Sequence, residues 1–196
     1  MKKYLLLVTL IVAPFYAHSV DVSGNMTIGS DYIWRGVSQK GGTAISAGVE
    51  AEQNGWYTGV WASQVDYGDN SDYEYDFYTG YSYDINDELA IDVGVIQYNF
   101  NNEPDNKLEE WYAGGTFRGF TAYYYEDLDN SDNHFAEYSY AFPIETVNLG
   151  FFWQDPNDFY GINIGKDFDN YTVSATYGEG RDDNKSAGVI SIAYNF

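Results

Sequence analysis

Carboxylates at every second position are the feature of this sequence with the clearest chemical potential. Glu74 and Asp76 alternate with Tyr73, Tyr75 and Phe77. In an extended strand, alternate residues share one face, so this spacing collects the acids on one side and the aromatic rings on the other. Carboxylates on one face can attract cations or line a polar channel. The chain has 30 Asp and Glu against 9 Lys and Arg, so a cationic or neutral partner is expected.

Nucleophilic or acid–base catalysis finds little support in the residue types. The sequence has no cysteine and only two histidines, of which His18 lies near the N-terminus. A hydrolytic set of Ser131, His134 and Asp132 can be imagined, since such catalysis relies on histidine beside a hydroxyl and a carboxylate. A lone histidine in a loop is usually a bystander. We therefore predict that the protein is not an enzyme and has no catalytic residue.

An acidic stretch at 127–132 superficially resembles a calcium loop. It lacks the glycine at position six and the glutamate at position twelve that an EF-hand needs. A second acidic stretch holds Asp66, Asp69 and Asp72. We interpret both as solvated loops, with weak divalent bridging to lipopolysaccharide phosphates as the alternative. The prediction is no metal site and no cofactor.

The elements that position these groups are strands. Apolar and polar residues alternate through several segments, and no segment has convincing helical spacing. The clearest cases are 73–84, 89–95, 136–142, 147–153 and 171–177. With 21 Tyr, 12 Phe and 5 Trp, the chain is far too aromatic to be disordered. Strands that face lipid on one side and water on the other combine these properties.

Short and long connections alternate along the chain. Tight turns are predicted at Asn54-Gly55, Asn86-Asp87, Arg118-Gly119, Pro143 and Asp169-Asn170. Longer connections are predicted near 36–42, 66–72, 101–107, 126–133, 155–158 and 179–185. This sorting is typical of outer-membrane barrels, which have tight periplasmic turns and longer external loops. We predict an all-β, transmembrane, antiparallel up-and-down barrel of twelve strands, with ten strands as the alternative.

The N-terminus indicates export. Lys2 and Lys3 precede an apolar stretch too short to span a membrane, and Ala17 and Ser19 offer small residues before a cleavage point. We predict a signal peptide at 1–19 and an outer-membrane barrel at 20–196. Loss of Lys2 and Lys3 takes the net charge from −21 to −23. That charge argues against nucleic acid as a partner.

The last nine residues alternate cleanly and end on an aromatic residue. Tyr194 and Phe196 resemble the C-terminal sorting signal of outer-membrane barrels, which the barrel assembly machinery recognises. The expected localisation is the bacterial outer membrane. The expected partners are therefore outer-membrane lipid, lipopolysaccharide and the assembly machinery.

The strand phase predicts which polar side chains face the lumen, because a charge facing lipid near the midplane costs about 2–4 kcal/mol. The predicted pore-lining residues are Asp31, Arg35, Glu50, Glu74, Asp76, Asp92, Glu110 and Glu137. Twelve strands leave less room than a large porin, so we predict a small porin-like channel with an acidic lumen. Such a lumen favours cations or small neutral polar solutes. The alternative is a non-conducting structural or adhesive barrel with acidic external loops.

The most distinctive segment runs from Ser30 to Gln39. Tyr32 and Trp34 are expected in an aromatic girdle at the membrane interface, and Arg35 is expected to turn inward or to cap the strand. No gate or plug domain is expected, since strands and turns use up the chain.

The same segment carries a resemblance to a known family. Its pattern Tyr32-x-Trp34-Arg35-Gly36-x-Ser38-Gln39 is followed by Gly59-x-Trp61-x-Ser63 and by Asp76-Phe77-Tyr78-Thr79-Gly80-Tyr81. These blocks resemble the TorF family of proteobacterial outer-membrane proteins, and the first block is the specific one. The resemblance implies an outer-membrane barrel with a porin function and poorly defined substrates.

Overall fold

The computed structural model describes residues 19–68, 72–101, 107–181 and 186–196. Residues 1–18 of the predicted signal peptide lie outside the described residues, as do parts of three predicted loops. Within the described ranges, no helix is long and apolar enough to cross a membrane.

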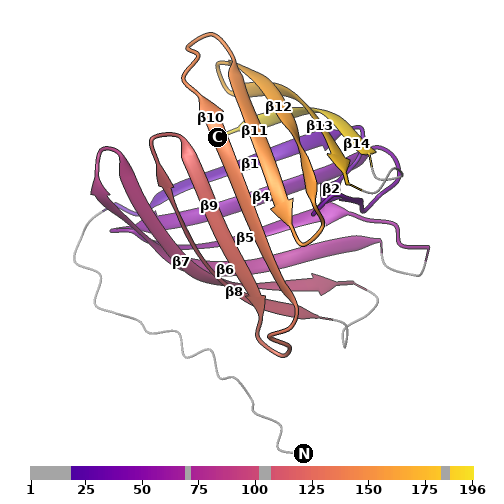
Figure 1. Cartoon of the computed structure of the whole chain (residues 1–196), viewed down its shortest axis with the longest axis horizontal. Coiled ribbons are helices and arrows are strands. Elements are labelled where there is room, and N and C mark those ends of the chain that lie inside the picture. Colours follow the sequence, from indigo (N-terminus) through magenta and orange to yellow (C-terminus); the bar gives the residue numbers. More distant parts are fainter. Residues whose placement is uncertain (1–18, 69–71, 102–106, 182–185) are drawn as a thin grey trace, which may run out of the picture.

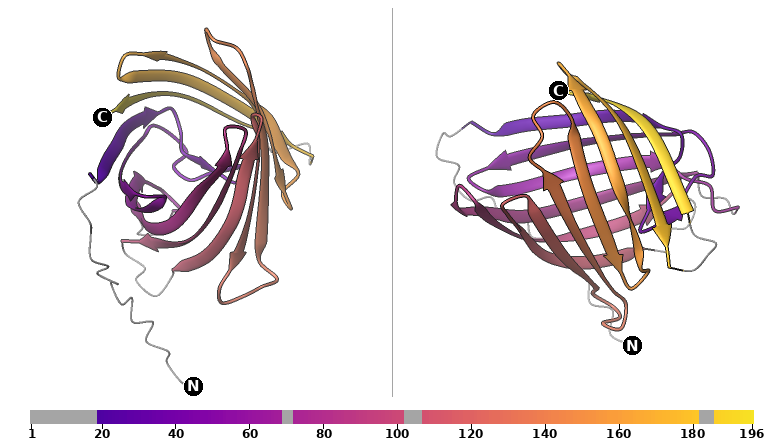
Figure 2. Two further views of the ribbon diagram at one scale, coloured as in Figure 1. Left: turned by 90° about the vertical axis from the view of Figure 1, so that its left-hand side faces the viewer. Right: turned by 45° about the horizontal axis from the view of Figure 1, so that its top comes forward.

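Twelve antiparallel strands form one closed barrel, which confirms the predicted fold class and strand count (Figures 1 and 2). Neighbours in the chain pair in order, and β1 closes the ring by pairing with both β4 and β14. The barrel strands are β1 (Asp21–Gly29), β4 (Ala44–Gln53), β5 (Trp56–Gln64), β6 (Tyr73–Asn86), β7 (Leu89–Phe100), β8 (Leu108–Phe117), β9 (Phe120–Asp127), β10 (His134–Phe142), β11 (Asn148–Asp155), β12 (Phe159–Phe168), β13 (Tyr171–Gly180) and β14 (Ser186–Asn195).

Alternation along each strand sorts the side chains between the outer surface and the lumen. Large apolar residues that are 41–54% exposed cover the outside, including Ile28, Val60, Phe77, Val93, Phe151, Ile162 and Ile192. Their neighbours point inward and include carboxylates, tyrosines, glycines and hydroxyl residues. A surface this apolar is stable in lipid, where a closed barrel also satisfies every backbone polar group.

The five predicted tight turns lie together at one end of the barrel, which we call the turn end. Positive φ angles mark three of them, at Asn54 (54°), Gly55 (83°), Arg118 (49°), Gly119 (82°) and Asp169 (52°). Hairpin turns with positive φ match the twist of the flanking strands, and Asn, Asp and Gly tolerate that backbone best. The connections predicted to be longer lie at the other end, the loop end. One pair departs from the predicted lengths, since 143–147 at the turn end is longer than 156–158 at the loop end.

The C-terminus closes the barrel seam. The backbones of Gly24 and Phe196 exchange two hydrogen bonds of 3.0 Å. A Cβ on Gly24 would lie 2.5 Å from the ring of Phe196, so this ring covers the glycine on the outer face. An aromatic side chain over a strand glycine fixes the register of the pair.

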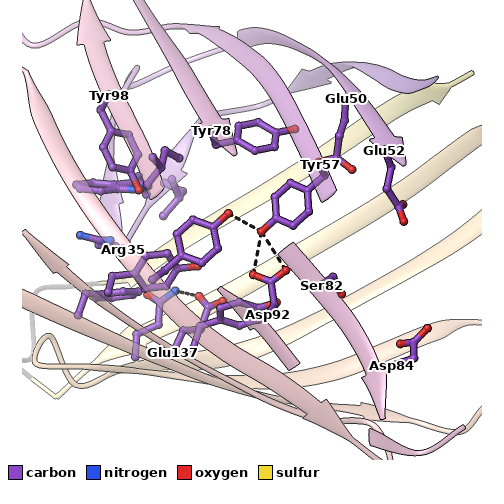
Figure 3. A pocket seen from close by; sticks show the side chains of 18 residues that line it. Arg35, Glu50, Glu52, Tyr57, Tyr78, Ser82, Asp84, Asp92, Tyr98 and Glu137 are labelled. Carbon is purple, nitrogen blue, oxygen red and sulfur yellow. Dashed lines mark hydrogen bonds between the residues drawn. The ribbon is translucent and has the colours of Figure 1, made fainter. Parts of the chain in front are cut away.

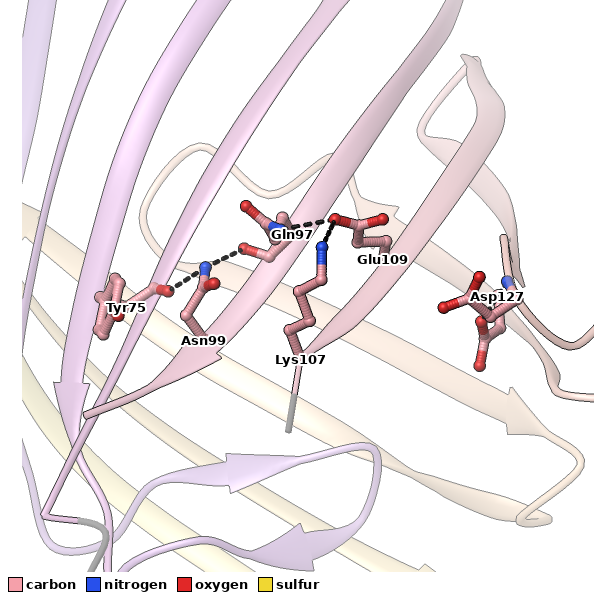
Figure 4. Close-up of polar contacts among 7 residues, drawn as sticks. Tyr75, Gln97, Asn99, Lys107, Glu109 and Asp127 are labelled. Atoms are coloured by element: carbon pink, nitrogen blue, oxygen red, sulfur yellow. Dashed lines mark hydrogen bonds and ion pairs between the residues drawn. The ribbon is translucent and has the colours of Figure 1, made fainter. Parts of the chain in front are cut away.

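A band of polar contacts marks the outer face at the loop end of β7 and β8 (Figure 4). The Lys107 ammonium lies 2.6 Å from Glu109, and the Gln97 amide donates to the same carboxylate at 2.6 Å. The Asn99 amide donates to the backbone carbonyls of Tyr75 and Gln97. These outward polar groups end the apolar surface of the two strands.

The connection between β1 and β4 enters the barrel instead of extending outside it. It forms a small hairpin from β2 (Ile33–Trp34) and β3 (Val37–Ser38). We call residues 30–43 the inserted loop. Two predictions are therefore wrong: Tyr32 and Trp34 pack against the inward rings of Trp61 and Tyr98 instead of forming a girdle, and a connection predicted to lie outside enters the lumen.

The physical reason for both corrections is the pairing chemistry of the hairpin tip. Its one cation and its aromatic rings find partners only on the inner wall. The most buried apolar side chains gather there, including Val65, Tyr98, Phe135 and Phe159, each at most 6% exposed. The packed core therefore lies around the inserted loop.

Candidate functional site

The tip of the inserted loop is attached to the far wall by a buried ion pair. Both terminal nitrogens of Arg35 donate to the carboxylate of Glu110 on β8, at 2.8 and 2.6 Å. The side chains are 12% and 1% exposed. The Tyr98 hydroxyl donates to the same carboxylate at 3.2 Å. A two-pronged pair of this kind fixes both position and orientation.

Aromatic rings surround the same guanidinium. Its central carbon lies 4.1 Å from the ring centre of Phe135, 4.3 Å from that of Trp34 and 5.2 Å from that of Tyr125. Aromatic faces attract a cation, and more strongly when water is excluded. Arg35 therefore sits in a cage of rings with a carboxylate at its base.

The backbone of the tip is also held. The Asn157 amide donates to the Arg35 carbonyl at 3.0 Å. Gly36 lies against the ring of Phe159, where a Cβ would be 2.8 Å from the nearest ring carbon. Arg35 and Gly36 have φ angles of 50° and 79°, which two-residue hairpin turns require. The family-like Arg35-Gly36 pair is thus a tight turn whose side chain and backbone both bind the wall.

The base of the inserted loop is organised by Asp31. Its carboxylate accepts bonds from the Tyr32 and Gly41 backbone amides at 2.7 and 3.1 Å, and from the Ser38 hydroxyl at 2.6 Å. Further out, the Asp66 amide donates to the Gln39 carbonyl at 2.7 Å. Asp31 therefore closes the loop on itself.

A cavity of about 780 Å³ occupies the lumen beneath the loop tip (Figure 3). The cavity extends from Arg35 to Glu52 and Asp84. Glu52 and Asp84 each lie two residues before a tight turn, so the cavity reaches close to the turn end. Five carboxylates line it: Glu50, Glu52, Asp84, Asp92 and Glu137. Arg35 is the one cationic side chain among its lining residues, and Glu110 already neutralises that charge.

A hydrogen-bonded chain crosses the middle of this cavity. The Tyr57 hydroxyl lies 2.9 Å from both oxygens of Asp92 and 2.6 Å from the Tyr112 hydroxyl (Figure 3). Nearby, the Gln154 amide donates to Glu137 at 2.7 Å. These contacts hold the carboxylates toward the open space.

Tyrosines on β5 to β9 are the site residues that the sequence analysis missed. Six of them line the cavity: Tyr57, Tyr78, Tyr98, Tyr112, Tyr123 and Tyr125. Four of these rings lie along the wall because inward glycines of neighbouring strands leave room for them. Tyr78 covers Gly59, Tyr57 covers Gly80, Tyr112 covers Gly94 and Tyr123 covers Gly114. We call the inward faces of β5 to β10 the aromatic wall.

A signal for these tyrosines was present in the sequence. Tyr78 lies two positions after Asp76, and Tyr112 two positions after Glu110, so each has the inward phase. Many other tyrosines have the alternation of lipid-facing residues, so the inward tyrosines did not stand out in the sequence.

The eight predicted pore-lining residues separate into three groups. Glu50, Asp92, Glu137 and Arg35 line the large cavity. Glu74, Asp76 and Glu110 have the inward phase but are 1–5% exposed and do not line it. Glu110 pairs with Arg35, whereas one oxygen each of Glu74 and Asp76 is buried without a hydrogen-bond partner. Asp31 lies in the inserted loop.

The opposite side of the lumen is lined by small residues. A cavity of about 250 Å³ lies there between the inserted loop and Thr27, Ser46, Thr176, Ala187 and Ser191. We call the inward faces of β13, β14 and β1 the small-residue wall. Ile33 lines both this cavity and the large one, so the inserted loop separates them.

His134 lies away from the lumen. In the register of β9 and β10 it lies opposite the outward-facing residue Glu126. Its ring stacks on Tyr124, with ring centres 6.0 Å apart. Within the described ranges, no group of three or more His, Asp or Glu side chains could hold a metal ion. The imagined histidine-based site thus has no place in the cavity, and the absence of enzymatic activity stays a prediction.

Comparison with solved structures places the fold among porins. The chain superposes on a structure described as "KdgM porin" with a TM-score of 0.63 and 12% identity, covering 89% of this chain and 99% of that one. A "KdgM porin in complex with disordered oligogalacturonate" gives a TM-score of 0.60 and 10% identity, covering 89% and 98%. At such identities the likeness shows the fold alone.

Sequence comparison identifies the family. A search of functionally curated proteins finds no relative. Residues 16–194 match the family described as "Bacterial protein of unknown function (Gcw_chp)". The match spans nearly the whole chain, and the protein therefore belongs to the Gcw_chp family.

Proposed function

We propose that the protein is an outer-membrane channel for small cations or small neutral polar solutes, narrowed by the inserted loop. The observation that carries this proposal is the charge of the large cavity. Five carboxylates line it, and its one lining guanidinium is already paired with Glu110. A ring of uncompensated carboxylates attracts cations and repels anions.

The fold supports a channel function, and the carboxylates of the cavity favour cationic over anionic solutes. The KdgM porin named above was solved with oligogalacturonate, a chain of sugar acids. An anion of that kind would meet Glu50, Asp92 and Glu137 in this lumen. We therefore infer a different cargo class on a similar barrel. The resemblance to the TorF family agrees with a porin function, and membership of that family is part of the proposal.

Localisation and assembly complete the proposal. The apolar outer surface fits a lipid bilayer, with the tight turns in the periplasm and the longer connections outside. Tyr194 lies near the end of the closing strand β14 and Phe196 follows it, and both would be recognised by the barrel assembly machinery during insertion. Outer-membrane lipid and lipopolysaccharide would surround the barrel.

A non-conducting structural or adhesive barrel is the second candidate, and one observation favours it. The inserted loop crosses the lumen and is held by a buried pair with distances of 2.6 and 2.8 Å. A loop held this firmly could close the passage. The two functions differ in whether ions cross the barrel.

Planar-bilayer recording of the refolded protein tests the proposal. We expect stepwise conductance, and a reversal potential of cation-preferring sign in a potassium chloride gradient. Asp92→Asn removes one lining charge while keeping its shape, so the reversal potential should move toward zero. Absence of conductance from protein that is natively folded, shown by circular dichroism and heat-modified gel mobility, would reject the channel and favour the second candidate.

A further inference from the structure

The protein itself shows which ligand its aromatic wall can bind. Arg35 belongs to the inserted loop, and the groups that receive it belong to the wall. They are the carboxylate of Glu110 and the rings of Tyr125 and Phe135. Trp34 closes the cage from the loop side. A guanidinium on a carboxylate, flanked by rings, is therefore a contact that this wall already makes.

A second carboxylate on the same wall has similar surroundings. Asp92 on β7 lies in the large cavity with Tyr57, Tyr112 and Tyr123, which also line it. The Tyr57 hydroxyl is 2.9 Å from both Asp92 oxygens, and the rings of Tyr112 and Tyr123 are 6.3 Å apart between centres. In the described part of the chain, no Lys or Arg forms an ion pair with Asp92.

We propose that Asp92 and its surrounding tyrosines form a binding site for an organic cation of the guanidinium type. The carboxylate supplies the charge, and the rings supply flat faces for a planar ion. A carboxylate has about four lone-pair directions, so Asp92 can accept from a ligand as well as from Tyr57. The inference names the cargo class of the proposed channel and rests on that function only for the route by which the ligand arrives.

The surroundings favour an organic cation over a metal ion. Calcium takes six to eight oxygen ligands, and magnesium takes six, of which several are water and one or two are carboxylates. Asp92 has phenol groups around it, and in the described ranges no set of three acidic or histidine side chains could hold a metal. Rings also contribute little to a strongly hydrated ion, whereas a guanidinium is weakly hydrated and stacks on them.

They also favour a cation over a neutral polar ligand. A neutral ligand could donate to Asp92 and stack on Tyr123, but it would leave the negative charges of the cavity uncompensated. Glu50 and Glu137 line the same space and add to that charge. A cation gains from all three carboxylates, since their fields add.

Isothermal titration calorimetry of the refolded barrel in detergent micelles tests the site without requiring conduction. The probes are ethylguanidinium, its neutral analogue ethylurea, and sodium, all at constant ionic strength. We expect saturable binding of ethylguanidinium only. Asp92→Asn should weaken that binding by about tenfold or more, because it removes the charged partner.

Two further variants separate the site from general charge. Asp84→Asn makes the same charge change in the same cavity near the turn end, and it should weaken ethylguanidinium binding by less than about twofold. Tyr123→Phe keeps the ring and should bind as the native protein does, whereas Tyr123→Leu should bind more weakly. Circular dichroism and heat-modified gel mobility confirm that each variant is folded.

The outcomes decide between distinct failures. Equal binding of ethylurea would mean a polar rather than a cationic site, and equal losses in Asp92→Asn and Asp84→Asn would mean diffuse charge attraction. Either result overturns the inference and leaves the channel proposal standing. Binding as expected in a barrel without conductance would support the site and reject the channel.

Discussion

The two sides of the lumen differ in both size and charge. The aromatic wall has large rings and carboxylates and borders a cavity of about 780 Å³. The small-residue wall has mainly Ser, Thr, Ala and Gly residues, with Val189 among them, and borders a cavity of about 250 Å³. The inserted loop leaves the end of β1 on the small-residue wall and attaches to the aromatic wall through Arg35. One wall leaves space for the loop, and the other binds it.

This division explains how an acidic lumen can be packed and still polar. On the small-residue wall, short hydroxyl side chains pair with one another, as Ser174 and Ser191 do at 2.7 Å. On the aromatic wall, rings cover glycines and leave the carboxylates free to face the cavity. Because of this asymmetry, most of the carboxylates and aromatic rings that face the large cavity lie on one side of the barrel.

Removing the cation that joins the loop to the aromatic wall should have the largest effect. Arg35→Ala leaves Glu110, which is 1% exposed, as a buried charge without its partner. Breaking a buried pair in this way costs about 3–5 kcal/mol. We expect that loss in the free energy of unfolding by urea in lipid vesicles, followed by tryptophan fluorescence, and a larger conductance if the loop leaves the lumen.

Two variants control for this result. Arg181→Ala breaks an exposed pair with Asp158, in which the arginine is 81% exposed, and should cost less than about 1 kcal/mol. Arg35→Met combined with Glu110→Leu removes both charges and should recover most of the lost stability. If Arg35→Ala proves no more harmful than Arg181→Ala, the aromatic wall does not hold the loop.

A glycine on the aromatic wall and one on β12, between the two walls, offer a comparison of tight and loose packing. On the aromatic wall, Gly94→Ala places a Cβ against the Tyr112 ring and 2.7 Å from the Thr79 carbonyl. Overpacking of this kind costs about 1–3 kcal/mol and would push Tyr112 toward the cavity. On β12, Gly165→Ala meets nothing nearer than 3.4 Å and should change stability by less than about 0.5 kcal/mol.

The measurement is again urea unfolding, with conductance as a second readout. Gly94→Ala should also lower the conductance, because Tyr112 would lose its 2.6 Å contact with Tyr57 and enter the cavity. Equal effects of the two alanines would show that the aromatic wall is packed no more tightly than β12.

Most of the barrel could be predicted because its rules are local. Alternation in segments such as 73–84 assigns the two faces, and turn residues such as Asn54-Gly55 mark the ends of strands. Each loop or turn separates consecutive strands, so counting them yields twelve. None of these steps requires knowledge of contacts between distant residues.

The candidate site was harder to predict because its contacts join distant parts of the chain. Arg35 pairs with Glu110 across 75 positions, and Asn157 reaches the Arg35 carbonyl across 122. Phase alone showed that Glu110 points inward, but it could not show that a loop residue neutralises it. The sequence rules also treat a loop as external, so the inserted loop, whose Tyr32 forms a hydrogen bond with Glu74, was missed.

Glu74 and Asp76 provide the finest test, which compares buried inward carboxylates with those that line the cavity. The phase prediction made Glu74 and Asp76 part of the pore, yet they are 3% and 5% exposed and do not line the cavity. Combining Glu74→Gln with Asp76→Asn should therefore shift the reversal potential much less than combining Glu50→Gln with Glu137→Gln.

The reason is that both pairs remove two charges from inward-facing positions of the barrel, so their access to the permeating ion is the main difference. A buried carboxylate also gains little from water, and a neutral amide at the same position should leave the barrel as resistant to urea as before or more so. Equal shifts in the reversal potential would mean that the inserted loop leaves the lumen during conduction. Ions would then pass directly beside Glu74 and Asp76.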